Sequence, residues 1–350
     1  MSLPSEPLAP SAQPDGAAGP NATGPAEGRG PWRIAWRRLR RNRSAMVSLA
    51  VLLAVAALTL LAPAYAGWLG IDPFRSNIAG TLVIDGQSVP VMEQSTTGLG
   101  LGVTPIGPTW DPRGYFLGAD NQGRDVAARL LYGGRNSLVI AGAATVVCLT
   151  LATLVALVAG YMGGIVDMVL SRILDVLWAF PVSLLAISLS IVLLTSAFTV
   201  GPVTITAGSL ILPIGIIGVI YVPYVARPIR AQVLTLRQSE FVLAAIGLGL
   251  PTSRILRKDV LPNLMPTLIV FVPILLALAI TTESALSYLS IGVQPPDASW
   301  GTIIQDGQTL LYSRPWVALA PGLAIVVTVL ALNVLGDAVR DALDARGHGR

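Results

Sequence analysis

Long stretches of apolar residues without a charged side chain divide the sequence into pieces that are long enough to cross a membrane. The uncharged stretches cover residues 44–71, 136–166, 176–226, 260–282 and 315–336. A helix needs roughly 20 residues to cross a bilayer, so the longest stretch has room for two crossings, with a break near residues 199–202. The pattern therefore predicts an all-α integral membrane protein with six transmembrane helices.

Composition agrees with this pattern and limits the chemistry. Of the 350 residues, 53% are hydrophobic and 12% are charged, and the mean hydropathy is +0.69, which leaves too few polar side chains to cover a soluble globule. Cys148 and His348 are the only cysteine and the only histidine, so we expect no disulfide framework, no Cys/His zinc site and no histidine catalyst. Lys258, the only lysine, does not stand in a GxxxxGK[ST] phosphate loop. We therefore expect no catalytic residue, metal or cofactor on this chain.

Basic side chains predict the orientation. Cytoplasmic loops near membrane helices are enriched in Lys and Arg, and a chain that starts inside places 17 of its 23 basic residues in the cytoplasm. Both termini are therefore predicted to be cytoplasmic. The net charge of +4 follows from this asymmetry, so it is no evidence for binding to nucleic acid.

The segments before the second crossing differ in character. Residues 1–30 contain six prolines and five glycines without apolar periodicity, which predicts a disordered cytoplasmic tail. Residues 31–44 are predicted to form a basic amphipathic helix at the membrane interface. The first crossing, 45–66, has an apolar run of about 18 residues, which exceeds the 7 to 15 of a signal peptide, so we expect it to be retained. Residues 67–136 are expected to form a long extracytoplasmic segment with two short strands around an Asp-Gly turn at 85–86.

A polar island at Glu240–Asn263 interrupts the apolar sequence. Residues 240–248 carry apolar side chains at helical spacing and small residues on one flank, which predicts a short helix that ends at Gly249. Thr252 is expected to cap a second short helix, and Pro262 is expected to stop it. A helix that is apolar or small on nearly all sides is not stable alone in water, so we expect it to lie in a groove of a cytosolic partner. The alternative is a loop that folds without a partner.

The island resembles the EAA motif of ABC-importer permeases. The residues at the spacing of that motif are Ala244, Ala245, Gly249, Leu261 and Pro262. Leu243 stands in the place of its first glutamate and Asp259 in the place of an isoleucine, while Glu240 supplies an acid three residues earlier. In that family the motif forms a coupling helix that docks into the ATP-hydrolysing subunit. The resemblance implies coupling helices at 240–262, with ATPase contacts from Glu240, Phe241, Ala244, Ala245, Gly249, Arg254, Leu261 and Pro262.

Three further stretches resemble the OppC/DppC-type permeases of dipeptide and oligopeptide importers. They are LGADNQGRDVAARLLYGGRNSL at 117–138, RILDVLWAFP at 172–181 and ESALSYLSIGVQPPDASWG at 283–301. The resemblance implies the type I ABC importer permease fold in a bacterial inner membrane, with a permease core at 137–337 and a cytoplasmic end at 338–350. It covers about residues 117–346 and does not explain the role of residues 76–110.

The resemblance also implies partners and a cargo. The partners are a second permease that completes a heterodimer, two ABC ATPase subunits that bind ATP and Mg, an extracytoplasmic substrate-binding protein and the lipid bilayer. The implied cargo is peptides. Nickel chelates or another small solute remain an alternative, because selectivity rests largely on the binding protein. A membrane receptor or scaffold is a third hypothesis, and copurification of ATPase subunits would argue against it.

Glu283 lies in the outer half of the fifth predicted helix. An acid near the centre of a membrane helix costs roughly 2.5 to 3.5 kcal/mol, and less toward the interface, so this carboxylate should face protein or water. It either lines a translocation path, for which Trp178 is a second candidate, or accepts a hydrogen bond from Thr281, Thr282 or a neighbouring helix.

Charged residues at the ends of the predicted helices suggest ion pairs. Arg172 is expected to pair with Asp175, and Arg340 with Asp337 or Asp344, because these residues are three or four apart on a helix. On the predicted outer side, charge is also carried by Arg124, Asp125, Arg129 and Arg135, close to the second crossing. They form either a functional cluster or a solvated face.

Overall fold

The computed structural model describes residues 31–84, 87–94, 102–195, 198–200, 203–205 and 208–344. The tail at 1–30 and the Asp-Gly pair at 85–86, for which sequence predictions were made above, lie outside the described residues. The α-helices are α1 (Pro31–Arg41), α2 (Arg43–Leu60), α3 (Ala62–Leu69), α4 (Val126–Met162), α5 (Gly164–Ala179), α6 (Val182–Thr195), α7 (Ile211–Ile220), α8 (Val222–Arg237), α9 (Glu240–Gly247), α10 (Thr252–Ile255), α11 (Leu261–Tyr288), α12 (Trp300–Gly307) and α13 (Trp316–Leu343). A π-helical turn, η1 (Leu256–Val260), joins α10 to α11, and a 3-10 turn, η2 (Gln308–Leu310), follows α12.

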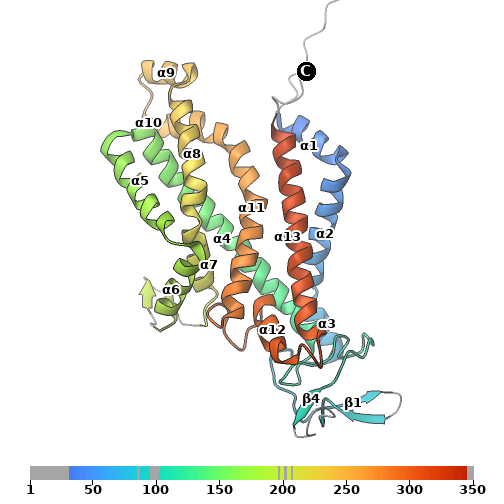
Figure 1. Cartoon of the computed structure of the whole chain (residues 1–350). Coiled ribbons are helices and arrows are strands. Elements are labelled where there is room, and N and C mark those ends of the chain that lie inside the picture. The colour runs from blue at the N-terminus through green and yellow to red at the C-terminus, as the bar shows by residue number, and fades with distance from the viewer. Residues whose placement is uncertain are drawn as a thin grey trace, which may run out of the picture.

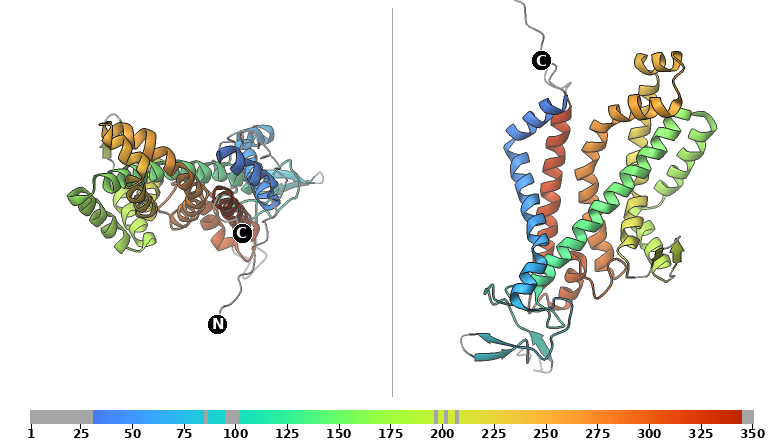
Figure 2. Two further views of the ribbon diagram at one scale, coloured as in Figure 1. Left: turned by 90° about the horizontal axis from the view of Figure 1, so that it is seen from above. Right: turned by 180° about the vertical axis from the view of Figure 1, so that it is seen from behind.

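The long helices run side by side between two ends of the molecule (Figure 1). One end carries α1, α9 and α10, and the other carries α3, α12 and the strands β1 to β4 (Figure 1). From above, the molecule is elongated, with α5 and α6 at one side and α1 to α3 at the other (Figure 2). The longest helix, α4, crosses between them and packs against α7, α8 and α11.

Four helical segments of the described chain are long and apolar enough to cross a membrane. They are Arg43–Leu60, Val126–Met162, Thr252–Tyr288 and Trp316–Leu343. Two bent pairs pass the same test together, α5 with α6 at 92° and α7 with α8 at 43°, so the number reaches six if each bent pair is one crossing. The structure is therefore a largely helical one with four to six candidate membrane spans.

The bend between α5 and α6 lies at Pro181, and proline is a common cause of a sharp bend in a helix. Phe180, the preceding residue, is extended with φ −89° and ψ 138°, because a proline disfavours helical dihedrals in the residue before it. The bend between α7 and α8 falls at Tyr221, ahead of Pro223 in the first turn of α8.

Three short antiparallel hairpins complete the fold. The pair β1 (Thr81–Ile84) and β2 (Gln87–Pro90) is the predicted hairpin, with Thr81 opposite Pro90. The pairs β3 (Met92–Gln94) with β4 (Val103–Pro105), and β5 (Phe198–Val200) with β6 (Val203–Ile205), were not predicted. Strands of three residues carry too little alternation to be recognised from sequence.

Two predicted helix boundaries are wrong. The second crossing was expected from Ser137, but α4 begins eleven residues earlier, at Val126. Asp125 caps α4 by accepting a hydrogen bond from the Ala128 amide at 2.8 Å. The arginines at the start of α4 bind partners that are distant in the sequence and come close only in the folded chain. The uncharged stretch that predicts the last crossing ends at residue 336, whereas α13 continues to Leu343.

Candidate functional site

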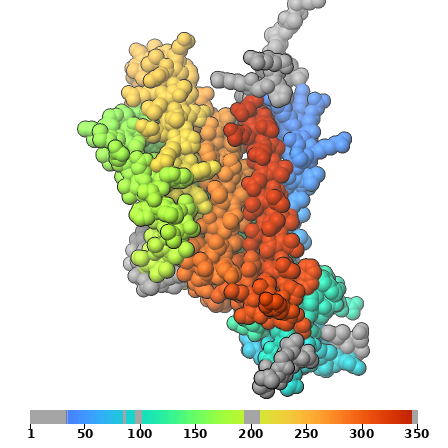
Figure 3. Space-filling model, in the orientation of Figure 1, coloured from blue at the N-terminus to red at the C-terminus, as the bar shows by residue number. Residues whose placement is uncertain are grey.

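A helical hairpin, formed by α9 and α10, projects beyond the rest of the molecule at the end that also carries α1 (Figure 3). The first helix ends in a Schellman motif. Gly249 is left-handed with φ 72°, its amide donates to the Ile246 carbonyl at 2.9 Å, and the Leu250 amide donates to the Ala245 carbonyl at 3.2 Å. A glycine is favoured here because it adopts this conformation without a Cβ penalty. The predicted end of the helix at Gly249 is confirmed.

The helix α9 has one buried and one exposed apolar face. Val242 and Ala245 are buried within the main apolar cluster, which also contains Ile255 and Val260 from the following turns. The other face exposes Phe241 at 45%, Leu243 at 55%, Ile246 at 46% and Leu248 at 79%. We call these four residues the α9 apolar face. Ala244 and Gly247 are exposed between these four residues. Because their side chains are small or absent, another helix or a groove can approach the backbone of α9 closely.

The second half of the hairpin differs from the prediction. Thr252 does not cap a helix, because Pro251 is the N-cap residue and makes no side-chain cap bond. Pro262 does not stop the helix either, since the segment is helical from Thr252 through Tyr288. The Leu261 amide bonds the Leu256 carbonyl across the wider π turn. Pro262 then follows in the first turn of α11, where a missing backbone N–H is tolerated.

Charged side chains of the hairpin are exposed. Glu240 lies in the first turn of α9, where a carboxylate interacts favourably with the helix dipole. Arg254, Arg257 and Lys258 are also exposed on the second half of the hairpin. Both signs are therefore available to a partner around the α9 apolar face.

Ion pairs brace the same end of the molecule. Arg230 of α8 makes a bidentate pair with Asp167 of α5, at 2.5 Å to each carboxylate oxygen, and Arg227 of α8 bonds Asp175 of α5 at 2.8 Å. The predicted pair of Arg172 with Asp175 is present but long, at 3.8 Å, with both side chains exposed. An exposed pair of this kind contributes little to stability. The shorter contact of Asp175 is the one to Arg227 on another helix, and it is exposed as well.

The second predicted ion pair is wrong. Within the described residues, Arg340 forms no ion pair with Asp337 or Asp344, although all three are exposed near the end of α13. Solvated side chains gain little free energy from an ion pair and lose conformational freedom when they form one. Helical spacing alone is therefore not enough to predict an ion pair.

A stack of aromatic rings lies on an exposed surface of α5 and α8. Trp178 is 42% exposed, stacks on Tyr224 with ring centroids 6.3 Å apart, and has the Arg227 guanidinium 5.3 Å above its ring. Tyr224 in turn meets Phe271 of α11 edge to face. Trp178 therefore faces outward from this chain and is accessible to a ligand or a second subunit.

Glu283 lies instead inside the packing of α11, α4 and α12. Its side chain is fully buried and accepts hydrogen bonds from Ser137 of α4 at 2.8 Å and from Ser287 at 2.7 Å. Thr281 and Thr282, its suggested partners, bond elsewhere, to the Ala277 carbonyl and to Tyr221. The hydrogen bond to a neighbouring helix is therefore present, and a carboxylate enclosed in this way does not line an open path within this chain.

A buried ion cluster links the start of α4 to α12 at the opposite end from the hairpin. Asp306 of α12 bonds Arg124 at 2.8 Å and Arg129 at 2.9 Å, and Arg124 also bonds Asp120 at 2.7 Å. Arg129 is only 2% exposed, so a solvated face is excluded for these residues, while Arg135 is exposed. Burial raises the pKa of Asp306, and Arg129 and Arg124 act in the opposite direction.

The sequence did not reveal Asp306, Arg230 or Ser137 as members of these networks. Their partners are 177, 63 and 146 residues away. Charges near helix ends were the available signal, but pairing them requires the arrangement of the helices. Among the described residues no group of three or more His, Cys, Asp or Glu side chains could hold a metal ion.

Comparisons with known proteins agree with each other over nearly the whole chain. Residues 152–348 match the family described as binding-protein-dependent transport system inner membrane component, and residues 30–77 match the N-terminal TM domain of oligopeptide transport permease C. The chain is 32% identical over 316 residues to the dipeptide transport system permease protein DppC of Alkalihalophilus pseudofirmus, with 90% of each chain covered. It is 35% identical over 315 residues to the oligopeptide transport system permease protein OppC of Bacillus subtilis, again with 90% of each covered. A chain from an inward-facing form of the MetNI methionine ABC transporter is 17% identical, with a TM-score of 0.49, and the match covers 61% of this chain and 96% of that chain.

Proposed function

The chain belongs to the family of binding-protein-dependent transport system inner membrane components, and from this membership we propose that it is the permease subunit of an ABC importer for peptides. It is a multi-pass membrane protein and not itself an enzyme, and ATP is hydrolysed by partner subunits. Two relatives named for dipeptide and oligopeptide transport, each covering 90% of the chain, support peptides as the cargo.

The α9 apolar face is the single observation that carries the coupling role. Four large apolar side chains are exposed on a helix that is itself anchored by Val242 and Ala245. This end lies beyond the apolar spans, so lipid does not cover it, and exposed apolar patches of this kind mark sites of protein contact. We infer that the ATPase subunit covers this face and that Glu240 and Arg254 contact the rim of its groove.

The arrangement of the ends supports the proposed orientation. α1, the hairpin and the last turns of α13 lie at the same end (Figure 1), as they must if the chain crosses the membrane an even number of times. Counting each bent helix pair as one crossing gives six. In this proposal the end with α9 is cytoplasmic, the end with α12 and the strands is extracytoplasmic, and the helices form a type I importer permease.

Continuity of the helix below the hairpin suggests how movement is transmitted. The segment Thr252–Tyr288 is one helix with a single π turn, so a displacement of α9 and α10 shifts α11 along its length. At the far end of α11, Glu283 bonds α4, and Asp306 fixes α12 to the start of α4. ATP-driven closure of the ATPases would thereby reach the extracytoplasmic side through a chain of rigid contacts.

The remaining partners belong to the same proposal. A second permease completes a heterodimer around the translocation path, and Trp178 on the outer surface of α5 is available to that path. An extracytoplasmic binding protein delivers the peptide, and the two ATPases bind ATP and Mg.

The test is to replace the two most exposed leucines of the α9 apolar face, Leu243 and Leu248, by serine in the tagged importer complex. Each buried leucine contributes about 1.5–3 kcal/mol, so we expect the ATPase subunits no longer to copurify and peptide uptake to be lost. Leu311, 46% exposed at the opposite end, gives the matched control Leu311→Ser, which should retain the ATPases. Undiminished copurification of the double variant would refute the docking role.

A further inference from the structure

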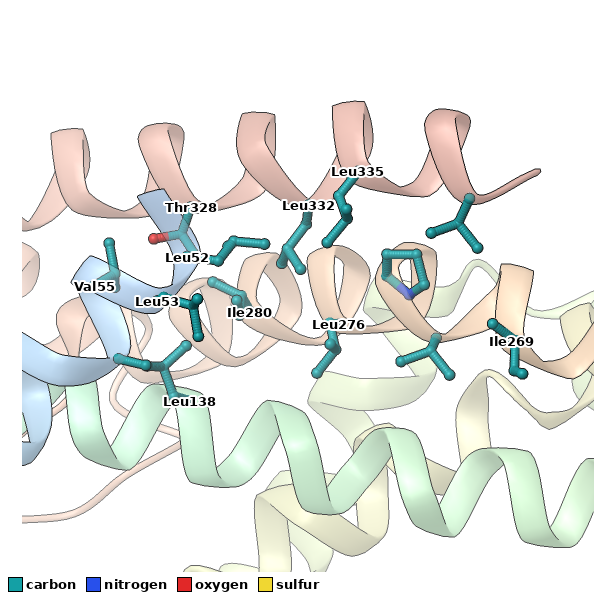
Figure 4. A pocket seen from close by; sticks show the side chains of 14 residues that line it. Leu52, Leu53, Val55, Leu138, Ile269, Leu276, Ile280, Thr328, Leu332 and Leu335 are labelled. Atoms are coloured by element: carbon teal, nitrogen blue, oxygen red, sulfur yellow. The ribbon is translucent and has the colours of Figure 1, made fainter. Parts of the chain in front are cut away.

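An apolar groove runs between α2, α4, α11 and α13 (Figure 4). Its volume is about 460 Å³, in the range of sites that hold a ligand. Thirteen of its fourteen lining side chains are apolar, and the exception, Thr328, donates its hydroxyl to the Ala324 carbonyl of its own helix at 2.7 Å. The groove therefore offers no free hydrogen-bonding group and suits an apolar occupant.

The length of the groove corresponds to half of a bilayer. On α13 its lining extends from Thr328 to Val339, and on α11 from Ile269 to Ile280. Each stretch spans eleven residue steps, or about 16 Å at 1.5 Å per residue. The hydrocarbon core of a bilayer is about 30 Å thick, so the groove matches a single leaflet.

Basic side chains gather at the end of the groove marked by Val339. The helix α1 packs against α2 and α13 at this end (Figure 1), and six arginines on α1 and at the start of α2 are exposed. They are Arg33, Arg37, Arg38, Arg40, Arg41 and Arg43. Within the described residues none of the six forms an ion pair, and Arg40 alone contacts an aromatic ring, that of Trp36. Such a cluster attracts anionic lipid headgroups.

We propose that the groove holds an acyl chain of an anionic phospholipid from the leaflet that α1 contacts, with the headgroup bound by the α1 arginines. Two other occupants fit less well. A transmembrane helix of a second subunit is 10–12 Å wide and needs the full thickness of the membrane, and a peptide would find no partner for its backbone amides. The proposal goes beyond the transport function and does not depend on the cargo.

The test is photo-crosslinking in the assembled importer, reconstituted in phosphatidylcholine nanodiscs. The probe is phosphatidylglycerol with a diazirine in the acyl chain, compared with phosphatidylcholine carrying the same group, and crosslinked peptides are quantified by mass spectrometry. We expect several-fold more crosslinking of phosphatidylglycerol to the peptide that contains residues 328–339. In 1 M salt, where the Debye length is about 3 Å, this preference should disappear.

Neighbouring alanines on α2 provide a matched pair of variants. Ala56 lines the groove, whereas Ala57 is exposed and does not. Ala56→Phe should fill the groove and reduce the crosslink at 328–339 several-fold, and Ala57→Phe should leave it unchanged. Equal crosslinking of the two lipids, or no effect of Ala56→Phe, would overturn the proposal. Loss of the second permease from the complex on Ala56→Phe would overturn it in favour of a protein helix in the groove.

Discussion

The substitution Gly249→Val tests whether the shape of the hairpin transmits ATP hydrolysis to transport. Gly249 has φ 72°, and a Cβ added there would meet no atom within 4 Å. The Cβ of valine therefore meets no collision, and the cost that the structure shows is that of the left-handed backbone. No spanning helix is altered, so the variant should still insert and assemble in the membrane.

The expected loss of ATPase affinity follows from the cost of the left-handed backbone conformation at residue 249. A residue with a Cβ pays about 1–2 kcal/mol for the left-handed conformation, and a β-branched residue lies toward the upper end of this cost. If the turn opens in the free variant and docking of α9 restores it, docking must supply the strain, and the affinity of the ATPase falls by up to the same free energy, or about 5–30-fold. If the turn also stays open in the complex, α9 remains away from its place on α8 and coupling is lost.

The assay measures ATP hydrolysis by the reconstituted complex with and without loaded binding protein, together with peptide uptake. Gly67→Val is the matched control, because Gly67 is exposed in the helix α3 at the opposite end, with no atom near its Cβ position and no positive φ. Valine there replaces a poor helix former and should be neutral or slightly stabilising. Wild-type stimulation and uptake in Gly249→Val would show that the hairpin is not the transmission element.

Two further predictions concern orientation and Glu283. With Cys148 replaced by serine, a cysteine at Gly100 should react with an impermeant reagent added from outside, and one at Arg237 should react only after the membrane is opened; the reverse pattern would exclude the proposed orientation. Glu283→Leu should lower the thermal unfolding midpoint of the complex, because two buried serine hydroxyls lose their acceptor at about 1–3 kcal/mol. Glu283→Gln should keep both midpoint and uptake near wild type, and a loss of uptake at an unchanged midpoint would assign Glu283 to the translocation path after all.

The sequence predicted those features that depend on short stretches of chain. Apolar length located the candidate spans, and Gly249 located the end of α9, because each is decided by local dihedrals or by transfer to lipid. Pro262 was misread because the rule that proline ends a helix does not anticipate a π turn just before it. The same helix also continues through Pro266 and Pro273, so a proline alone does not end it.

The charged side chains of the predicted outer side were left undecided for a different reason. The sequence placed Arg129 either in a functional cluster or on a solvated face, since an isolated arginine is more stable in water than in a protein interior. It is buried because Asp306 comes from a helix 177 residues later in the chain. The early start of α4 has the same cause, because these residues become compatible with a packed helix only once the partner is in place.

Polar contacts also explain why α12 has one defined position. Apolar helices gain little from packing against each other in lipid, so their positions depend on close approach and on hydrogen bonds. A Cβ on Gly133 would come within 2.9 Å of Ile303, and one on Gly134 within 2.9 Å of Trp300, so α12 lies directly on the backbone of α4. The Trp300 amide also donates to Ser137, which donates to Glu283 on α11. Two glycines, a serine and a buried acid thus hold three elements in one arrangement. The hairpin at the opposite end is attached to this frame through α8 and the start of α11, and it lies far from these contacts along both helices.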